Sequence, residues 1–302
     1  MKTRAGFVAL IGEPNSGKST LMNKMIGAKI SIVTHKVQTT RAQIRGIQII
    51  DQSQIIFLDT PGLFEPRQRL EQAMVATAWG GAEDADIVLL LIEAHRGVTE
   101  GVELIIRNLH TRAKVGPTSL AINKIDREKP DILLELSSKL NAMFNFDQTF
   151  MLSAKTGDGV ADLNGWLAEQ VPHGPWLYGE DQITDRPLRL IAAEVTREKL
   201  ILRLHQELPY KSTVETEFWE ERKDKSIHIE QVIYITRKGH KGIVLGNKGE
   251  TIKAVSIAAR KELEEFLHLR VHLFIRVKVR PNWMDERERY EQMGLQFTGQ
   301  DV

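Results

Sequence analysis

The sequence contains no cysteine, which excludes both a disulfide framework and a thiolate metal site. Its longest apolar runs, such as residues 87–92, are far too short to span a bilayer. No basic segment followed by an apolar one opens the chain, so we expect no secretion signal. Internal repeats are also absent, and the nine histidines show no paired spacing typical of a metal site. These absences predict an intracellular protein.

The composition is that of a folded globular protein. Charged residues make up 27% and apolar residues 42% of the 302 residues, and this length accommodates two domains with separate cores. The net charge of +1 averages acidic and basic regions, so it indicates no particular class of partner.

A glycine-bearing loop near the start of the chain is the most informative stretch. Residues 12–19 read Gly-Glu-Pro-Asn-Ser-Gly-Lys-Ser, between an apolar run at 7–11 and an expected helix at 20–26. A strand, such a loop and a helix in this order form the P-loop pattern. Gly12 and Gly17 allow the backbone to curl around a phosphate and point N–H groups towards it. The following helix adds its positive dipole end at the same place.

Two side chains of this loop have defined chemical tasks. We expect the Lys18 ammonium group to reach the β- and γ-phosphates of a nucleotide and the Ser19 hydroxyl to hold Mg²⁺. The alternative is an ordinary glycine turn that carries a lysine before a helix. The strand before the loop and the helix after it favour phosphate binding.

Strand-like and helix-like stretches alternate through the first half of the chain. Apolar runs at 44–50 and 55–58, separated by polar residues, predict a hairpin. Beyond them we expect strands at 87–92, 119–122 and 149–152 and helices at 102–109, 131–144 and 160–171. This alternation predicts an α/β fold, in which helices cover both faces of a mainly parallel sheet. Ligands of such folds bind at the carboxyl ends of the strands.

Three motifs fall at such strand ends. Asp59, followed by Thr60-Pro61-Gly62, stands where a phosphate-bound Mg²⁺ needs a partner; alone, it also fits a common Pro-Gly turn.

Residues 123–126 (Asn-Lys-Ile-Asp) and 153–155 (Ser-Ala-Lys) follow later strands. A carboxylate at Asp126 can accept two N–H bonds from guanine, while the Asn and Lys before it brace the base and neighbouring loops. The Ala154 N–H is expected to meet guanine O6. Each motif alone also fits a polar loop, but their order behind a P-loop favours a guanine nucleotide site.

A breaker-rich stretch at 175–187 indicates a domain boundary. Beyond it we expect an amphipathic segment at 188–205, antiparallel strands at 213–218 and 227–235, a helix at 250–267 and a final strand at 271–279.

A Gly-x-x-Gly turn, residues 246–249, lies between two helical segments of this second region. The two glycines allow close approach of a nucleic-acid backbone, and nearby basic side chains suit phosphates. The alternative is an ordinary helix corner with a solvated basic rim. The order helix, two strands, helix, Gly-x-x-Gly, helix, strand resembles the KH domain in its type II form. That order favours RNA binding.

Taken together, these residues resemble the Era family of GTPases over nearly the full chain. The resemblance rests on residues 12–19, 38–41 (Gln-Thr-Thr-Arg) and 59–63 (Asp-Thr-Pro-Gly-Leu), and on 197–200 and 207–210 in the second domain. It implies that Thr40 closes on Mg²⁺ and the γ-phosphate, and that Asp59 reaches Mg²⁺ through water. Leu63 stands where Ras-like enzymes place a water-orienting glutamine, and leucine makes no hydrogen bonds. This implies slow intrinsic hydrolysis or another orienting group.

The motifs and the resemblance together define the expected site residues. The catalytic residues are Lys18 and Thr40, and the metal ligands are Ser19, Thr40 and Asp59. The nucleotide-binding set is Gly12, Glu13, Pro14, Asn15, Ser16, Gly17, Lys18, Ser19, Thr20, Asp59, Thr60, Pro61, Gly62, Leu63, Asn123, Lys124, Asp126, Ser153, Ala154 and Lys155, of which Glu13 and Ser16 fill variable positions. The RNA-binding set is Lys241, Gly246, Asn247, Lys248, Gly249 and Lys253.

By this resemblance we expect a P-loop GTPase domain at 1–174, a linker at 175–187 and a KH domain at 188–302. The protein would hydrolyse GTP to GDP with Mg²⁺ and bind small-subunit (16S) ribosomal RNA and the 30S subunit during subunit assembly. We expect a cytoplasmic monomer. Two alternatives stay open: an RNA-binding module whose hydrolysis is incidental, and a switch weakly attached to the inner face of the cell membrane.

A narrower hypothesis concerns the role of Asn15 in the P-loop. In similar GTPases an asparagine here helps to hold a monovalent cation such as K⁺ beside the phosphates, which would compensate for Leu63. The alternative is that Asn15 only stabilises the loop.

Overall fold

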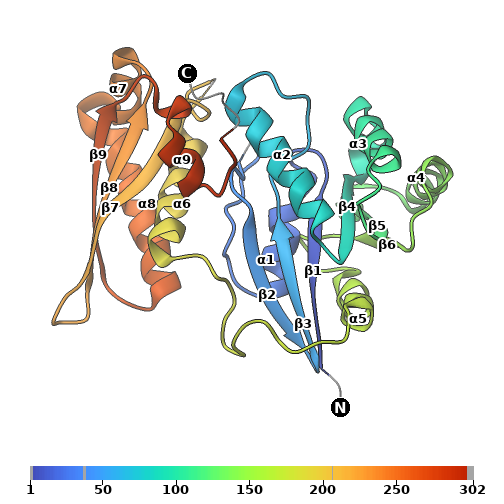
Figure 1. The fold of residues 1–302 in the computed structure, drawn as a ribbon. Coiled ribbons are helices and arrows are strands. Elements are labelled where there is room, and N and C mark those ends of the chain that lie inside the picture. The colour runs from blue at the N-terminus through green and yellow to red at the C-terminus, as the bar shows by residue number, and fades with distance from the viewer. Residues whose placement is uncertain (1–2, 37–38, 206, 298–302) are drawn as a thin grey trace. The chain divides into compact units, whose positions relative to one another are not determined.

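The structure is a computed structural model that describes residues 3–36, 39–205 and 207–297 (Figure 1). These residues form two compact units. The first unit takes the described residues within Met1–Ser31, Val37–Asp185 and Tyr290–Val302, and the second those within Ile32–Lys36 and Arg186–Arg289. Across the described ranges, no helix combines the length and the apolar character that a membrane crossing requires.

The first unit is built on a six-stranded sheet with the order β2-β3-β1-β4-β5-β6. β2 is antiparallel to β3 and all other neighbours are parallel, which confirms the hairpin and the mainly parallel sheet. The central strands are covered on both faces and therefore read as continuous apolar runs. The strands are β1 (Arg4–Ile11), β2 (Ile44–Ile50), β3 (Ser53–Asp59), β4 (Ile87–Glu93), β5 (Thr118–Asn123) and β6 (Thr149–Leu152).

Helices cover both faces of this sheet. On one face, α1 (Lys18–Ile26) and α5 (Val160–Gln170) bury their apolar sides; on the other lie α2 (Arg69–Glu83), α3 (Glu100–Thr111) and α4 (Pro130–Met143). The sequence did not predict α2. Two short 3₁₀ turns, η1 (Ala94–Arg96) and η2 (Ile125–Arg127), follow β4 and β5.

Part of the stretch expected to be a linker runs along the hairpin of β2 and β3. The fully buried Gln54 side chain accepts the N–H groups of Leu177 (2.8 Å) and Tyr178 (3.0 Å) and donates to the Tyr178 carbonyl (2.8 Å). Further along, the Ile47 N–H donates to the Ile183 carbonyl at 2.9 Å. The side chain of Gln54 thus provides the hydrogen-bond partners of the Leu177 and Tyr178 backbone groups, which belong to no strand.

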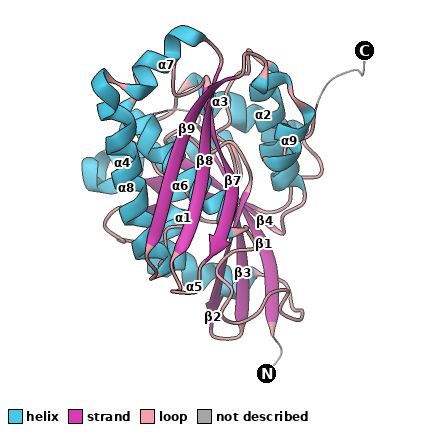
Figure 2. Cartoon of the chain, turned by 90° about the vertical axis from the view of Figure 1, so that its left-hand side faces the viewer, coloured by secondary structure: helices cyan, strands magenta, loops and turns pink. Residues whose placement is uncertain are grey.

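The second unit has a three-stranded sheet in the order β7-β8-β9, which Figure 2 shows side by side. β7 and β8 are antiparallel, whereas β8 and β9 are parallel. The predicted order of helices and strands is therefore confirmed. The elements are α6 (Leu188–Arg203), β7 (Ser212–Glu221), β8 (Ile227–Ile235), α7 (Lys238–Leu245), η3 (Asn247–Gly249), α8 (Glu250–Leu267), β9 (Val271–Val279) and η4 (Trp283–Asp285). The last helix, α9 (Arg287–Gln292), begins in the second unit and ends in the first.

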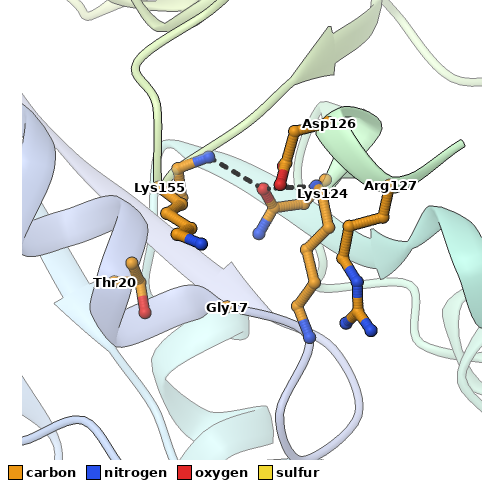
Figure 3. Close-up of a pocket in the computed structure, with 8 residues that line it drawn as sticks. Gly17, Thr20, Lys124, Asp126, Arg127 and Lys155 are labelled. Atoms are coloured by element: carbon orange, nitrogen blue, oxygen red, sulfur yellow. Dashed lines mark hydrogen bonds between the residues drawn. The ribbon is translucent and has the colours of Figure 1, made fainter.

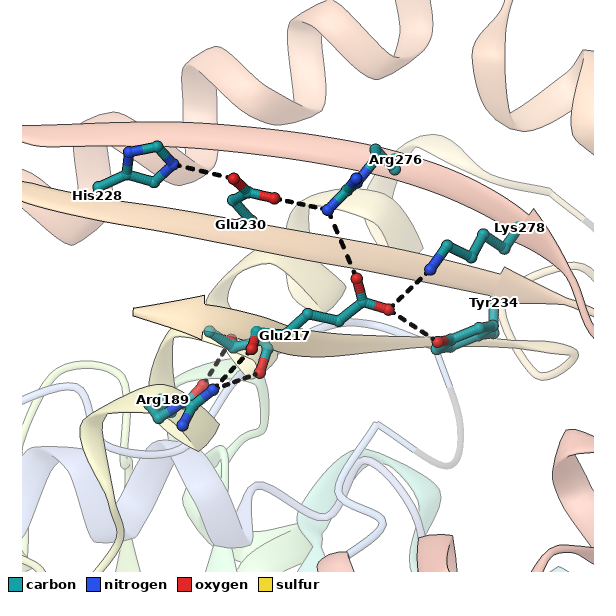
Figure 4. Close-up of polar contacts among 8 residues, drawn as sticks. Arg189, Glu217, His228, Glu230, Tyr234, Arg276 and Lys278 are labelled. Atoms are coloured by element: carbon teal, nitrogen blue, oxygen red, sulfur yellow. Dashed lines mark hydrogen bonds and ion pairs between the residues drawn. The ribbon is translucent and has the colours of Figure 1, made fainter. Parts of the chain in front are cut away.

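The two faces of this second sheet differ in character. Alternate residues of β8 pack with α6 and α8 in apolar clusters, while the other face carries ion pairs (Figure 4). There, Glu217 accepts from Lys278 Nζ at 2.9 Å and from the Tyr234 hydroxyl at 3.1 Å. Glu230 pairs with Arg276 at 2.5 Å. The cations Arg276 and Lys278 are therefore neutralised by carboxylates of the sheet itself.

Candidate nucleotide site and nucleic-acid interface

The P-loop lies at the carboxyl end of β1, between β3 on one side and β4 on the other. From β1 the chain runs first to the β2–β3 side and then returns to the β4 side. A crevice at such a point of reversal is where open α/β sheets bind ligands. The topology therefore places residues 12–19 at the expected binding edge.

The backbone of the loop has left-handed residues at Gly12 (φ 146°), Asn15 (φ 67°) and Gly17 (φ 103°). A Cβ at Gly12 would lie 2.3 Å from the Leu91 carbonyl oxygen, and one at Gly17 would lie 2.1 Å from Asn123 Nδ2. Both glycines are thus required by packing as well as by conformation. Asn15 is a residue type that tolerates this region.

Lys18 is 6% exposed and curls back over the loop. Its Nζ donates to the carbonyl oxygens of Gly12 and Glu13, both at 3.0 Å. Burial lowers the pKa of the Lys18 amine to about 8, against the opposing charges of Asp59 and Glu13. At neutral pH the group is therefore mostly cationic, and it can exchange carbonyl partners for phosphate oxygens.

The Glu13 side chain turns towards α3. Its Oε2 accepts the Thr99 hydroxyl at 2.8 Å, at the start of that helix. Glu13 therefore contributes backbone to the loop while its carboxylate ties the loop to α3.

The three predicted metal ligands meet in one cluster of oxygens. Ser19 Oγ donates to Asp59 Oδ2 at 2.6 Å and lies 3.0 Å from Thr40 Oγ1. Thr40 and Asp59 are buried. Two hydroxyls and a carboxylate are the oxygen donors that Mg²⁺ prefers, so this donor set fits the ion. Gln38, which belongs to the same predicted segment as Thr40, lies outside the described residues.

The segment after Asp59 packs against β1 and the P-loop. The buried Thr60 hydroxyl donates to the Leu10 carbonyl at 2.7 Å. The Leu63 N–H donates to the Gly12 carbonyl at 2.9 Å, and the Leu63 side chain is 3% exposed within the apolar core. A Cβ on Gly62 would lie 2.7 Å from the Pro14 nitrogen. Leu63 thus supplies packing and has no polar group to offer a water molecule.

A cavity of about 520 Å³ opens beside the P-loop (Figure 3). Its walls come from the start of α1 and from the loops that follow β5 and β6. All of its lining residues except Arg127 were predicted from the sequence. They are Gly17, Thr20, Asn123, Lys124, Asp126, Arg127, Ala154 and Lys155.

Asn123 braces the loops around this cavity. Its Nδ2 donates to the Ser16 carbonyl at 2.8 Å, and its Oδ1 accepts the N–H groups of Lys124 (2.7 Å) and Ala154 (3.0 Å). Lys124 Nζ extends to the Asn15 carbonyl at 2.8 Å. The bracing of neighbouring loops predicted for Asn123 and Lys124 is present, and their contact with the base stays a prediction.

Here the Ala154 amide differs from expectation, because it donates to Asn123 rather than into the cavity. Ala154 is 4% exposed, and a buried N–H needs an acceptor. A bond from this amide to a base would have to share or replace the one to Asn123.

Asp126 is held at the cavity by one hydrogen bond. The fully buried Ser153 donates its hydroxyl to Asp126 Oδ1 at 2.6 Å. Asp126 itself is exposed. The bond fixes the plane of the carboxylate while the group stays accessible to a ligand.

In the second unit, the Gly-x-x-Gly turn joins α7 to α8 through η3. Gly246 (φ 76°) and Gly249 (φ 82°) are left-handed. A Cβ on Gly246 would lie 2.7 Å from the Thr251 nitrogen, whereas one on Gly249 would make only an ordinary contact, 4.0 Å from Ile252 Cγ2. Gly246 is thus required by internal packing and Gly249 by conformation.

The basic residues around this turn point into solvent. Lys241, Lys248 and Lys253 are exposed, as is Asn247. Within the part of the chain that the structure describes, these lysines form no ion pair, in contrast to Arg276 and Lys278. Their charge is available to an anionic partner.

Sequence reasoning missed several residues that act on these sites. Ser31 donates to Asp59, Arg127 lines the cavity, and Glu93 pairs with Lys124 Nζ at 2.7 Å. None belongs to a local motif, so only the folded chain brings them to the site.

A P-loop with this oxygen cluster and base cavity, followed by a KH unit, defines a GTPase with an attached KH domain. The family model described as "50S ribosome-binding GTPase" matches residues 7–124, and the KH domain model matches residues 207–284. GTPase Era of Dinoroseobacter shibae is 66% identical over 98% of this chain and 96% of its own length. GTPase Era of Brucella suis biovar 1 is 59% identical over 98% and 94%.

The chain belongs to the GTPase Era family. A solved structure of Era in complex with MgGDPNP and nucleotides 1506–1542 of 16S ribosomal RNA matches with a TM-score of 0.91 and 35% identity, over 97% of this chain and 99% of that one. A structure of a single-residue variant of Aquifex aeolicus Era bound to GDP.AlF4- matches equally well.

Proposed function

We propose that this protein binds GTP with Mg²⁺, hydrolyses it to GDP and binds small-subunit ribosomal RNA through its KH unit, in small-subunit assembly. The observation that carries the proposal is the convergence of the Ser19–Thr40–Asp59 cluster and the Asp126 cavity around one P-loop. The Era structures solved with MgGDPNP and 16S ribosomal RNA, and with GDP.AlF4-, support it.

The side chains of the first unit divide the work of phosphoryl transfer. Lys18 and the loop amides would bind phosphate oxygens, and Ser19, Thr40 and Asp59 would hold Mg²⁺. When bound, the ion neutralises charge on the β- and γ-phosphates. Thr40 is recruited when a γ-phosphate is present, so it orders the site for hydrolysis. Catalysis then rests on positioning and electrostatic stabilisation.

Asp126 reads the base. Ser153 occupies one carboxylate oxygen, and a carboxylate has lone pairs enough to accept two further N–H bonds. Guanine offers two donors on one edge, whereas adenine offers the opposite pattern.

Asn15 keeps two roles open within this proposal: a ligand of a monovalent cation, or a stabiliser of the left-handed turn. Replacing sodium by potassium at constant ionic strength distinguishes them. A cation role predicts faster turnover in potassium for the parent protein and no change for Asn15→Ala. Equal rates in both salts for the parent would leave only the structural role.

RNA binding is assigned to Gly246, Asn247, Lys248 and Gly249, with Lys241 and Lys253 on phosphates. We also propose the domain limits 1–174 and 188–302, joined by residues 175–187. The compact units depart from these limits, because residues 32–36 belong to the second unit and residues 290–297 belong to the first. A cytoplasmic monomer completes the proposal, and weak peripheral attachment to the inner face of the cell membrane stays an alternative. Size-exclusion chromatography tests the monomer, and flotation with anionic vesicles tests the attachment.

Two assays on the full-length protein test the main proposal. Single-turnover GTP hydrolysis should be measurable in the parent and lost in Lys18→Ala. Fluorescence anisotropy should show binding of a labelled 3′-end oligomer of 16S RNA in preference to a large-subunit oligomer of equal length. An RNA-bound protein that never converts GTP would favour the module whose hydrolysis is incidental. Equal binding of both oligomers would contradict the small-subunit assignment.

A further inference from the structure

Ser31 makes a contact with the predicted metal site that no motif assigns to it. Its Oγ donates to Asp59 Oδ2 at 2.7 Å, and the two residues are 1% and 0% exposed. Ser19 Oγ donates to the same oxygen at 2.6 Å. Two hydroxyls from different parts of the chain therefore converge on one carboxylate oxygen.

The position of Ser31 is set by α1, the helix that also carries Ser19. Asn23 Oδ1 accepts the N–H groups of Ile30 and Ser31, each at 3.0 Å, and Asn23 Nδ2 donates to the Ser31 carbonyl at 2.7 Å. The Ile30 side chain is buried among the apolar residues that pack on α1. Asn23 lies one helical turn after Ser19, so one rigid element fixes both hydroxyls.

We infer that Ser31 is a positioning residue for Mg²⁺: it orients the Asp59 carboxylate for the ion without itself touching ion or nucleotide. This inference rests on the proposed function. Mg²⁺ demands near-ideal octahedral geometry, so the orientation of each oxygen around it matters. Partners that hydrogen-bond to a metal-site carboxylate fix that orientation, and their removal typically costs 10–100-fold in metal affinity. Ser19 is itself an expected ligand, whereas Ser31 is not. Its bond to Asp59 therefore persists whatever Ser19 binds.

The test is the Mg²⁺ dependence of nucleotide binding in the full-length protein. The dissociation rate of a fluorescent GDP is measured while free Mg²⁺ is titrated, which gives the Mg²⁺ concentration at the midpoint. Ser31→Ala should raise this midpoint about tenfold and leave GDP affinity in excess chelator unchanged.

Ser53→Ala is the matched control. Ser53 is likewise a buried serine of the first unit, and its hydroxyl donates to the Ala168 carbonyl at 2.7 Å, away from the P-loop. Ser53→Ala should have the same midpoint Mg²⁺ concentration as the parent protein. Ser31→Cys, which retains a weak donor of similar size, should shift the midpoint in the same direction by less. This second variant keeps the test valid if Ser31→Ala does not fold.

Three outcomes would count against the inference. A midpoint within about twofold of the parent in both Ser31 variants would overturn it, since the expected shift is at least tenfold. A loss of GDP affinity that is equally large in chelator would show that Ser31 only supports the loop. A parent protein that binds no guanine nucleotide would overturn the proposed function, and this inference with it.

Discussion

At the residue scale, the choice of base rests on how a single carboxylate is presented. Asp126 reaches the cavity with one oxygen fixed by Ser153. A bound guanine would bury this group, and a donor left unpaired in a buried site costs about 1–3 kcal/mol. The chemistry of one side chain is therefore enough to select a nucleotide.

Asp126→Asn should lower GTP affinity at least about fivefold, because an amide group replaces one acceptor by a donor and leaves a guanine N–H unpaired. A preference for xanthine nucleotides should appear at the same time. Calorimetry with GTP and XTP measures both effects. Asp84→Asn makes the same charge change at an exposed position outside the cavity and should bind like the parent. GTP affinity unchanged in Asp126→Asn would refute the base-reading role.

Thr40 should matter for turnover rather than for GDP. We expect its hydroxyl to serve the γ-phosphate state and not the GDP state, so Thr40→Ala should keep GDP affinity nearly intact. Single-turnover hydrolysis should fall about a hundredfold, as for the loss of one preorganised transition-state contact. If GDP and GTP binding instead weaken together, Thr40 supports the fold and not the reaction.

At the scale of the element, the sequence predicted the strands well and one helix not at all. The central strands of the first sheet contain continuous apolar runs, which local pattern detects. Helix α2 buries large residues such as Met74 and Trp79 on its core side, but Gly80 and Gly81 argue against a helix. Gly81 is needed because a Cβ there would lie 2.7 Å from Gln43 Nε2. Only the tertiary structure reveals this contact.

The functional site likewise contains residues that motifs predict and residues that only the folded chain brings there. Residues within motifs, such as Lys18 and Asp126, were predicted because their spacing carries the chemistry. Ser31 and Arg127 reach the site through contacts that no local pattern encodes. The Ala154 amide stays predicted to meet guanine O6, and its hydrogen bond to Asn123 is a contact that the sequence did not predict.

The segment along the hairpin should depend on Gln54. Gln54→Ala removes the acceptor of two backbone N–H groups; since both hydrogen bonds are only partly buried, we expect their loss to cost at least about 1 kcal/mol in total. Local opening of residues 175–185 should therefore become at least about fivefold more frequent. Limited proteolysis with mass spectrometry of the fragments measures this as faster cleavage there. Gln52→Ala, at an exposed side chain of the same hairpin, is the control. Equal cleavage rates in Gln54→Ala and the parent would contradict the role of Gln54.

At the scale of the whole molecule, the two units should carry separable functions. The P-loop, the oxygen cluster and the base cavity belong to the first unit, and the Gly-x-x-Gly turn belongs to the second. Each unit has its own apolar clusters. Substitutions in sites without shared partners act additively.

The double variant Asn247→Asp and Lys248→Asp tests this separation. It keeps both glycines but adds two negative charges and removes a positive one, so the interaction with phosphate becomes repulsive. Anisotropy with the 16S 3′-end oligomer should show a collapse of RNA binding, while GTP affinity stays within about twofold of the parent. Unchanged RNA affinity would move the interface away from the Gly-x-x-Gly turn, and a parallel loss of GTP affinity would contradict the independence of the units.

The central claim, that the first unit is a guanine nucleotide site, is tested most directly by calorimetric titration of the full-length protein with GTP and with ATP in Mg²⁺. Adenine lacks both donors that Asp126 is placed to accept, and two unpaired groups at about 1–3 kcal/mol each give a preference of at least thirtyfold. The account predicts one GTP site per chain and ATP binding weaker by that factor or more. Equal affinity for the two nucleotides, or no binding of GTP, would contradict it.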